Sequence, residues 1–529
     1  MTEYPSIFND VLSPVTAGPS SSNTSAPNRI ARLILSLLDH PLKHVKVEMS
    51  KQGGFPLTFY SMDSDIGLLS GFMGKDTNDF DGRQAIYDCF ARNESTCDFL
   101  FIEELPSKPA ELMLITVTDQ VGRTHKITAA SLGGGRIQIS RIDNFQVNID
   151  GQHYSMLIGI EPAEDNAFNS NLQSILGSIE KLTGRKPSWS ISMEVTETLI
   201  QIDCEEKQSV QLINEIQRLP CVRWVRQIAP VYFSTKRLTP AVPFRTCSEM
   251  ESYIRESGRS VIEAAYDYET AVCCCTKEEI DYYSLTLIDI ILNSVEAGYH
   301  PAFTYNGMMA PFAKTIINNP NIEELYPSGL IANASFSAIA AMEYSNSHGK
   351  IVCMPTGGSS GVIAGFLHTL YKEKNMAKKD LPKLLLAAGL YGLFLYETGY
   401  SGFLGCQAEI GSAAAMGAAM LASSMTNDIS KISAAASLSL QSFIGLVCDP
   451  VAGCVQIPCI IRNAAAVSVA ATMANMAVLG YPASIPFDEM AKAVLEVGNK
   501  LDGVNFCGTC TTASGQALSR RMSDKNYTV

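Results

Sequence analysis

Two cysteine-bearing segments near the C-terminal end of the chain read Gly402-Phe-Leu-Gly-Cys406-Gln-Ala-Glu-Ile-Gly411 and Cys448-Asp-Pro-Val-Ala-Gly-Cys454-Val-Gln-Ile-Pro-Cys459-Ile-Ile-Arg462-Asn463. Cys406, Cys448 and Cys459 lie in turns bounded by Gly or Pro, next to apolar helical stretches. Such turns can hold thiolates at a common point, and three thiolates can hold three irons of a cubane whose fourth iron stays open as a Lewis acid. A structural zinc site would instead favour a fourth ligand and CxxC pairs. Buried, inert cysteine remains the alternative.

These segments lie in the half of the chain that has a helical pattern. From Met250 onward, apolar residues recur at helical spacing almost to the end. The clearest examples are residues 248–257, 277–297 and 336–347. After Leu381 the helices are rich in Ala and Gly, which lets backbones pack closely. The sequence predicts an all-helical C-terminal catalytic domain over residues 244–529, after a Pro-containing linker at residues 238–244.

Residues 147–235 alternate between strand and helix patterns. The elements are expected at residues 154–160, 168–182, 189–195, 198–204, 210–218 and 224–233. Their order, βαββαβ, predicts a ferredoxin-like domain. This order resembles that of an ACT domain, a common amino-acid-sensing module.

Residues 1–146 mix both kinds of element and are expected to form an N-terminal α/β domain. We expect a helix at residues 29–38 and strands at residues 45–48 and 112–117. Residues 131–139, Ser-Leu-Gly-Gly-Gly-Arg-Ile-Gln-Ile, predict a glycine turn that leads into a strand. The fold class of the whole chain is therefore predicted to be α+β.

Composition excludes several classes of protein. The 529 residues include 53 acidic and 40 basic ones, and a net charge of −13 repels nucleic acid. The N-terminal sequence has no secretory pattern, and the most apolar stretches, residues 411–423 and 464–480, are shorter than the roughly 20 residues that cross a bilayer. Fifteen cysteines, an odd number, argue against a complete disulfide framework. We expect a cytoplasmic protein with neither nucleic acid nor a membrane as partner.

Several motifs occur in an order that points to one family. GCQAEIGSA, CDPVAG and PCxxRN closely resemble the signature of the bacterial iron–sulfur L-serine dehydratases. The N-terminal Ser6-Ile-Phe8 with Gly18-Pro-Ser-Ser-Ser22, the glycine turn at residues 131–135, and the loop Pro355-Thr-Gly-Gly-Ser-Ser-Gly-Val362 resemble the same family. The resemblance covers essentially the whole chain, as if the family's β and α parts were fused with an ACT module between them.

The resemblance implies a [4Fe-4S] cluster and the conversion of L-serine to pyruvate and ammonia by a lyase of amino-acid metabolism and gluconeogenesis. We expect a homodimer, because cyclic two-fold assembly is the commonest. Cys406, Cys448 and Cys459 match the cluster ligands, whereas Cys454 matches no ligand position. The hydroxyls and backbone amides of two loops, with two residues that follow a ligand, suit substrate binding. These residues are Ser20, Ser21, Ser22, Asn23, Thr24, Thr356, Gly357, Gly358, Ser359, Arg462 and Asn463. Helix caps, turns or a surface pair are the alternatives.

Pyridoxal phosphate, used by many other serine dehydratases, is not expected. That cofactor needs a lysine in a loop poised for a Schiff base, and residues 355–365 contain no lysine.

The chain departs from the family in its histidines. The family motif GPSSSHT here reads GPSSSNT, with Asn23 in place of histidine, and a second histidine-containing segment corresponds to the stretch around Asp63. Asn cannot titrate, so Asp63 is the candidate base, with a pKa raised by burial; a helix N-cap is the alternative role. The loss also leaves other substrates open, namely a 2-(hydroxymethyl) dicarboxylic acid or another β-substituted amino acid. A non-catalytic, cluster-bearing amino-acid sensor is the remaining alternative.

Other cysteines have no clear family role. Cys273, Cys274 and Cys275 are consecutive on a helix or its edge, and adjacent residues make a poor chelate, so we interpret them as structural. The family's C-terminal cysteine ligand is missing. Cys507 and Cys510 form a CxxC pair that can supply a ligand, form a disulfide switch, or have no function.

Overall fold

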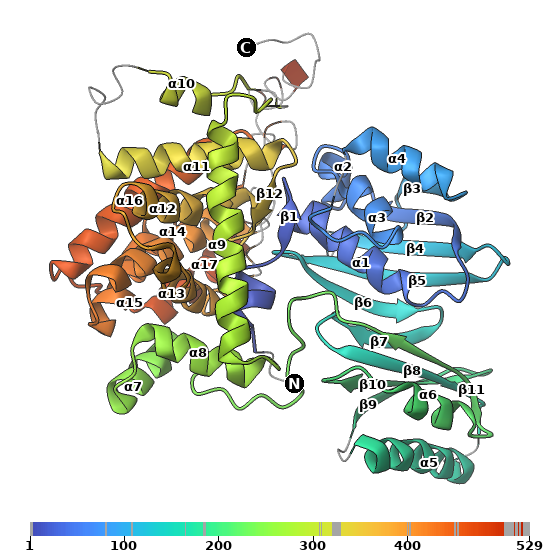
Figure 1. The fold of residues 1–529 in the computed structure, drawn as a ribbon. Helices are drawn as coiled ribbons and strands as arrows, with labels where there is room; N and C mark the ends of the chain where they lie inside the picture. Colours follow the sequence, from blue (N-terminus) through green and yellow to red (C-terminus); the bar gives the residue numbers. More distant parts are fainter. Residues whose placement is uncertain are drawn as a thin grey trace.

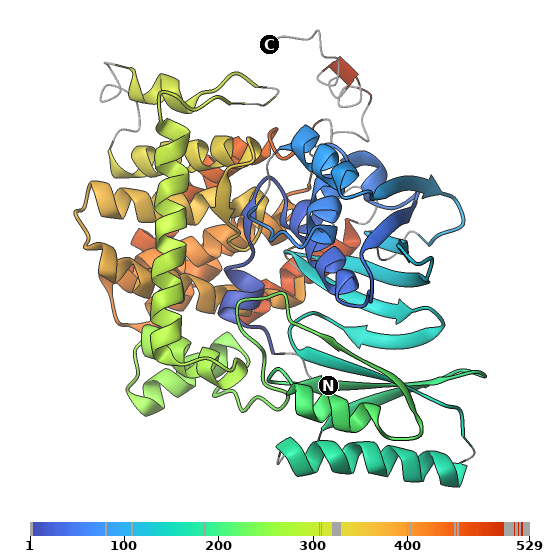
Figure 2. The ribbon, with the colours of Figure 1, turned by 45° about the vertical axis from the view of Figure 1, so that its right-hand side comes forward.

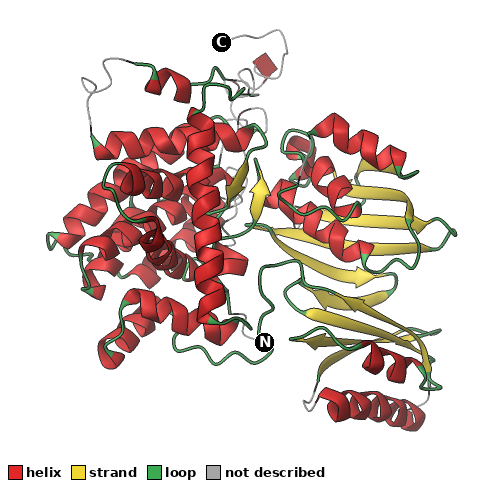
Figure 3. Ribbon diagram, in the orientation of Figure 1, coloured by secondary structure: helices red, strands yellow, loops and turns green. Residues whose placement is uncertain are grey.

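The computed structural model of the chain describes residues 4–79, 82–106, 109, 111–163, 165–183, 187–305, 307, 309–319, 329–398, 400, 404–448, 451, 454–501, 513, 517, 520 and 521. The fold is mixed α+β, as the sequence predicts. The helices of the C-terminal half pack together on one side of the molecule, and the two larger sheets, with the helices that pack on them, lie on the other side (Figures 1 and 3).

A six-stranded sheet forms most of the N-terminal part, in the strand order β3-β2-β4-β5-β6-β7. β2 and β3 are parallel, and the other neighbours are antiparallel. Buried and half-buried residues alternate along β4, because successive side chains of a strand point to opposite faces. The elements are β2 (Leu42–Ser50), α2 (Phe55–Thr58), α3 (Ser64–Phe72), α4 (Arg83–Arg92), β3 (Thr96–Ile102), β4 (Leu112–Asp119), β5 (Thr124–Gly133), β6 (Arg136–Ile142) and β7 (Phe145–Ile149), with α1 (Ala26–Leu35) packed on β5 and β6.

Two local expectations for this part are confirmed. The helix expected at residues 29–38 is α1, displaced toward the N-terminus because Pro27 lies in its first turn, where proline is tolerated. The glycine turn joins β5 to β6, and Gly133, Gly134 and Gly135 all have positive φ.

The next unit has the predicted βαββαβ order. Its antiparallel sheet has the strand order β11-β8-β10-β9, and two helices complete a core of its own. The elements are β8 (Tyr154–Ile160), α5 (Asp165–Thr183), β9 (Ser188–Met193), β10 (Thr198–Cys204), α6 (Val210–Gln217) and β11 (Val222–Ile228). β9 and β11 end earlier than expected, at Met193 and Ile228.

The remaining part is helical, and α14 contacts α12, α13, α15 and α16 at its centre. Its small side chains from Ala413 to Ala415 are fully buried, so neighbouring helices approach closely. The helices are α7 (Cys247–Ser257), α8 (Val261–Val272), α9 (Lys277–Tyr299), α10 (Ala313–Ile317), α11 (Leu330–Asn346), α12 (Ser360–Lys372), α13 (Leu381–Leu393), α14 (Cys406–Met425), α15 (Ile429–Gln441), α16 (Cys459–Val478) and α17 (Phe487–Lys500). Among the described helices, none is both long and apolar enough to cross a membrane.

One strand interrupts the region that the sequence predicts to be wholly helical. β12 (Lys350–Val352) pairs antiparallel with β1 (Val15–Ala17), and Val15 lies opposite Val352. The two strands lie side by side at the boundary between the helices and the sheets (Figure 1). The prediction of an all-helical domain is wrong at these residues because the partner strand comes from the far end of the chain.

The start of the chain packs into the helical core. Ile7, Phe8, Val11 and Leu12 are fully buried in the same cluster as residues of α8, α9 and α13. The buried carboxylate of Glu269 accepts hydrogen bonds from the Ser6 hydroxyl at 2.6 Å and from the Ile7 amide at 2.8 Å. Figure 2 shows this dark blue segment between the helices and the sheets.

Glycines allow the helices that carry the site loops to touch. A Cβ atom at Gly365 of α12 would lie 2.2 Å from the backbone oxygen of Ala334 on α11, a distance that no side chain tolerates. At Gly177 in α5, by contrast, a Cβ atom would meet nothing within 4 Å.

We therefore expect Gly365→Ala to lower the free energy of unfolding by about 1–3 kcal/mol, because α11 and α12 must separate. Gly177→Ala is the matched control, and it should raise stability by up to about 1 kcal/mol because alanine is the better helix former. Urea unfolding measures both. Equal effects of the two substitutions would contradict the close contact between α11 and α12.

Candidate active site

Three cysteines lie at the ends of neighbouring helices. Cys406 is the first residue of α14, Cys459 is the first residue of α16, and Cys448 follows α15. α14 contacts both α15 and α16. A hydrogen bond to Cys406, together with burial and the nearby Cys459, raises the pKa of the Cys448 thiol well above its usual range. The structure therefore brings together the three predicted ligand positions from separate segments.

The chemistry of this donor set suits a cluster better than a single ion. Within the described ranges, no group of three or more His, Cys, Asp or Glu side chains is arranged to hold one metal ion. A cubane distributes its cysteine ligands over three different irons, so its ligands need not meet at one point. The N-termini of α14 and α16 favour thiolates, and Arg462 Nη1 donates to Cys406 Sγ at 3.2 Å.

The loop of residues 356–359 lies between the N-terminal segment and α14. A Cβ atom at Gly357 would lie 2.7 Å from the backbone oxygen of Pro19, and one at Gly358 would lie 2.6 Å from Glu409 Oε1. The Thr356 hydroxyl donates to Glu409, a half-buried carboxyl one turn after Cys406. Both glycines are thus required by close approach, and the loop touches both parts of the molecule.

Asn463 ties this loop to α16. Its Nδ2 donates to the Gly358 carbonyl at 2.7 Å and to the Cys459 carbonyl at 2.8 Å. Asn463 is fully buried and Arg462 is half-buried, so the alternative of a surface pair is wrong for these two residues.

The serine-rich segment forms a buried π-helical turn at Ser21–Ser25. The Ser20 hydroxyl accepts from the Asn23 amide at 3.1 Å, so Ser20 caps this turn. The Thr24 hydroxyl donates to the Met62 carbonyl at 2.7 Å. Ser21 is buried, and Ser22 remains half-buried. Ser20 therefore has the helix-cap role that the sequence analysis gives as the alternative for this loop.

Asn23, in place of the family histidine, is held on both sides. Its Nδ2 donates to Glu111 Oε1 at 3.1 Å, and its Oδ1 accepts from the Thr58 hydroxyl at 2.7 Å. Glu111 is fully buried, and burial raises its pKa to about 7, while hydrogen bonds from Ser131 and Asn23 oppose the rise. Glu111 follows no motif, so no sequence signal could have identified it.

Asp63 occupies the N-cap position of α3 without capping it. Its backbone is left-handed, at φ 56°, and its side chain makes no cap hydrogen bond. One carboxylate oxygen accepts from Arg83 Nη2 at 2.6 Å, and the other lies 3.4 Å from His348 Nδ1. Burial raises the pKa of Asp63, and His348 and then Arg83 oppose the rise. The structure thus replaces the expected cap contact with contacts to Arg83 and His348.

His348 is a residue that sequence reasoning missed. It lies between α11 and β12, and it is one of the few non-glycine residues with positive φ, at 62°. Both members of the Asp63–His348 pair therefore have a backbone conformation that ordinary side chains rarely adopt, and such outliers concentrate at functional sites. Arg83 and Glu409 were also missed, although Glu409 lies inside the quoted cysteine motif.

The other cysteines fall into two groups. Cys273 lies just beyond α8 and pairs by its backbone with Lys236, in agreement with a structural role. Cys454 is half-buried, and burial with the nearby Asp63 carboxylate raises its pKa to about 11. Cys507 and Cys510 lie outside the described residues.

Comparison with known proteins gives a consistent result. A family model described as serine dehydratase alpha chain matches residues 197–503. The L-serine dehydratase alpha chain of Peptoniphilus asaccharolyticus is 33% identical over 284 residues, which cover 52% of this chain and 97% of that protein. The probable L-serine dehydratase alpha chain of Bacillus subtilis is 29% identical over 287 residues, 53% of this chain and 95% of that one. L-serine dehydratase 1 of Escherichia coli is 28% identical over 270 residues, 49% of this chain and 59% of that protein.

The raised pKa of Glu111 generates a prediction about stability. Between the usual glutamate value of 4.5 and about 7, the folded chain keeps a proton that the unfolded chain releases, so stability falls as pH rises through this window. We expect Glu111→Gln to remove up to about 3 kcal/mol of this loss. Urea unfolding at pH 4.5 and pH 8 measures it.

Glu104→Gln provides the control, because Glu104 is exposed and lies shortly before β4 in the sequence. That variant should keep the pH dependence of the unmodified chain. An equally steep loss of stability in Glu111→Gln would show that another group carries the proton.

Proposed function

We propose that this chain, which belongs to the serine dehydratase alpha chain family, is an iron–sulfur-dependent lyase that converts L-serine to pyruvate and ammonia. The enzyme class and the serine substrate follow the relatives, whose names are L-serine dehydratase. The observation that carries the proposal is the convergence of the Cys406–Cys448 thiols, the loop of residues 356–359 and Glu409 at one place. We also propose a cytoplasmic homodimer, because cyclic two-fold assembly is the commonest, and, from the resemblance, a role in amino-acid metabolism and gluconeogenesis.

Cys406, Cys448 and Cys459 would hold a [4Fe-4S] cluster. When bound, such a cluster supplies a Lewis-acidic iron that assists departure of a hydroxyl group. Arg462 supports this assignment because its guanidinium donates to the Cys406 sulfur at 3.2 Å. Pyridoxal phosphate is not part of the proposal, because residues 355–365 offer no lysine for a Schiff base.

The substrate carboxylate would bind at the loop of residues 356–359. The Thr356 and Ser359 hydroxyls lie 3.0 Å apart there, and a glycine-rich backbone suits an anion. Ser22 is the hydroxyl of the facing turn that remains half-buried rather than fully enclosed. The Thr356 hydroxyl donates its only hydrogen to Glu409, so the backbone amides of this loop are the donors left for a substrate carboxylate.

Asp63 would accept the proton from the substrate α-carbon, with His348 as its partner. Loss of that proton and of hydroxide leaves an enamine, which tautomerises and takes up water to give the keto acid and ammonia. The His348 imidazole, at 3.4 Å from Asp63, can take the proton onward, and Arg83 stabilises the ionised carboxylate. The absence of a cap hydrogen bond at Asp63 supports this role, because the side chain is free of a structural duty at the helix end.

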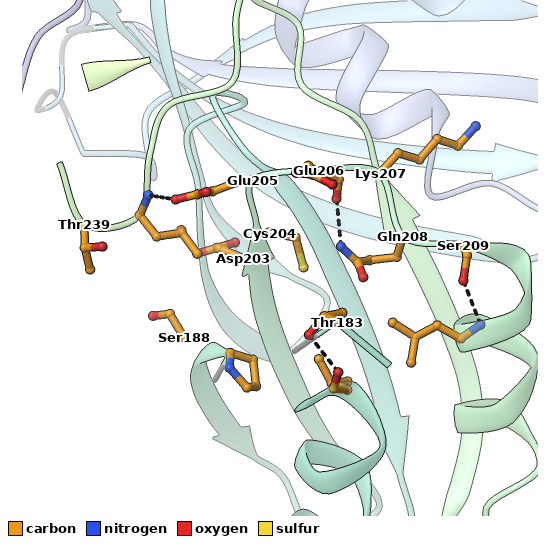
Figure 4. A pocket seen from close by; sticks show the side chains of 14 residues that line it. Thr183, Ser188, Asp203, Cys204, Glu205, Glu206, Lys207, Gln208, Ser209 and Thr239 are labelled. Carbon is orange, nitrogen blue, oxygen red and sulfur yellow. Dashed lines mark hydrogen bonds between the residues drawn. The ribbon is translucent and has the colours of Figure 1, made fainter. Parts of the chain in front are cut away.

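The βαββαβ unit would act as an ACT-type sensing module. Its own pocket of about 460 Å³ lies between the end of β10 and the two helices. Figure 4 shows Asp203, Glu205 and Glu206 around this pocket, with the Glu205 carboxylate accepting from the Leu238 amide at 2.9 Å. Three carboxylates in one wall suit a ligand with an ammonium group.

A 2-(hydroxymethyl) dicarboxylic acid is the runner-up substrate. The observation that favours it is Asn23, which is bonded to Glu111 and Thr58 and offers no titratable group where the family has histidine. Another β-substituted amino acid remains a variant of the main proposal, and a non-catalytic, cluster-bearing sensor is the alternative outside enzymology.

The cluster assignment predicts which cysteines hold iron. Cys406→Ala, Cys448→Ala and Cys459→Ala should each abolish iron content after anaerobic reconstitution, because each removes one of three ligands. Cys454→Ala and Cys274→Ala should retain the iron. Iron analysis and visible absorption measure the result, and full retention in the first three variants would refute the assignment.

The assignment of the base predicts the rate of turnover. Anaerobically purified protein should release ammonia and pyruvate from L-serine, and Asp63→Asn should lose roughly 10²–10⁴-fold in turnover with an intact cluster spectrum. Asp88→Asn is the matched control, since Asp88 lies exposed on α4, the helix that begins with Arg83. It should keep full activity.

The substrate panel separates the alternatives in the same assay. An unsaturated dicarboxylic product without ammonia would replace serine by the runner-up. No turnover of any hydroxy acid would leave the sensor. Near-normal turnover of Asp63→Asn would eliminate Asp63 as the base. The next candidates for the base would then be Ser64, Tyr60 or a residue of the helical part.

A further inference from the structure

A cavity of about 380 Å³ lies where the three parts of the chain meet, away from the candidate active site. β6 contributes Arg136, the ferredoxin-like unit contributes His153 and Asp203, and the segment that leads to the helices contributes Tyr232 and Lys236. The helical part contributes Tyr396. None of the residues assigned to the cluster or to the substrate loops lines this cavity.

Several polar groups in its walls have no hydrogen-bond partner. Arg136 Nε, Tyr232 Oη and His153 Nε2 are buried atoms for which the described residues supply none. Buried donors are almost always satisfied, and exceptions point to a missing water, ion or ligand. Three such atoms belong to residues that line this one cavity.

The cations of the cavity are unequally matched. Lys236 lies 2.9 Å from the Asp10 carboxylate, which neutralises it. The Arg136 guanidinium instead stacks 4.3 Å from the centre of the Tyr396 ring and donates to the Leu132 carbonyl at 3.1 Å. Within the described part of the chain, no carboxylate forms a salt bridge with Arg136. A guanidinium prefers a carboxylate as its planar partner, so a bound carboxylate would complete this wall.

Two carboxylates also line this cavity. Asp150 and Asp203 face the cavity, and Asp203 Oδ1 already accepts from Ser155 and Gln201. The adjoining pocket in Figure 4 shares Asp203 but is lined by further carboxylates, so it repels the group that Arg136 attracts.

We propose that this junction cavity is a binding site for a small carboxylate-bearing molecule, whose carboxylate meets Arg136 and the Tyr232 hydroxyl. Because its walls come from all three parts, a ligand there stabilises their arrangement by mass action. The site is separate from the catalytic proposal and does not depend on it.

Two probes of equal size test the site and its ligand. L-alanine carries an ammonium group beside its carboxylate, and propionate lacks the ammonium group. Isothermal titration of the full chain should detect binding of at least one probe, with one site per chain. Preference for L-alanine identifies an amino-acid site that uses Asp150 or Asp203, and equal binding identifies a simple carboxylate site.

Variants of the cavity give the decisive comparison. Arg136→Gln should weaken binding about tenfold or more, because a charge-assisted contact is lost. Tyr232→Phe should also weaken binding without lowering the stability of the ligand-free chain, since its hydroxyl has no partner there. Arg141→Gln, on the same strand but exposed, should bind as the unmodified chain does.

Asp63→Asn separates this site from the candidate active site, and it should bind both probes normally. Two results would overturn the proposal. One is the absence of binding by either probe at millimolar concentration. The other is binding that survives Arg136→Gln and Tyr232→Phe but is lost in Asp63→Asn. Should Arg136→Gln fail to fold, Tyr232→Phe alone decides.

Discussion

The pairing of β1 with β12 is the contact on which the candidate site depends. It continues beyond the strands, since the Cys353 amide donates to the Pro14 carbonyl at 3.0 Å. The two chain segments then run past each other until Gly357 lies against Pro19. Because both segments are held along their backbones, the serine-rich turn and the loop before α12 are set face to face without reliance on any one side chain.

The acidic side chains around the site need cationic partners when they are ionised. Asp63 and Glu111 are buried and Glu409 is half-buried, and desolvation raises the pKa of each carboxyl. The guanidiniums next to these acids are Arg83, beside Asp63, and Arg462, near Glu409. Such an excess of acidic groups costs free energy when ionised without partners.

The sequence could predict what is encoded locally. The βαββαβ order and the glycine turn at residues 133–135 follow from short-range patterns, and each is present. The sequence motifs identify the cysteine positions, and the proximity of these cysteines follows from the packing of α14 on α16. By contrast, Asp63 and His348 are far apart in sequence, and no period or motif links them. Likewise Glu111 looks like any strand-edge acid until Asn23 is seen to bond to it.

Ser20 illustrates a different limit of sequence reading. The serine-rich motif predicts that its hydroxyl binds substrate, yet in the structure this hydroxyl accepts a hydrogen bond from the Asn23 amide. The same residue type serves as cap and as ligand donor, so only the direction of the hydroxyl distinguishes the two roles. The neighbouring Ser22 is also a serine, but its environment differs from that of Ser20.

The burial of the first residues in the helical core has a consequence for synthesis of the chain. Ile7, Phe8, Val11 and Leu12 are synthesised before the sheet region, but Glu269 and the helices that enclose them are made only after it. During that interval these apolar side chains have no native place to pack, and exposed apolar surface invites aggregation. The native packing of this early segment therefore has to wait until the helices of the C-terminal half have been synthesised.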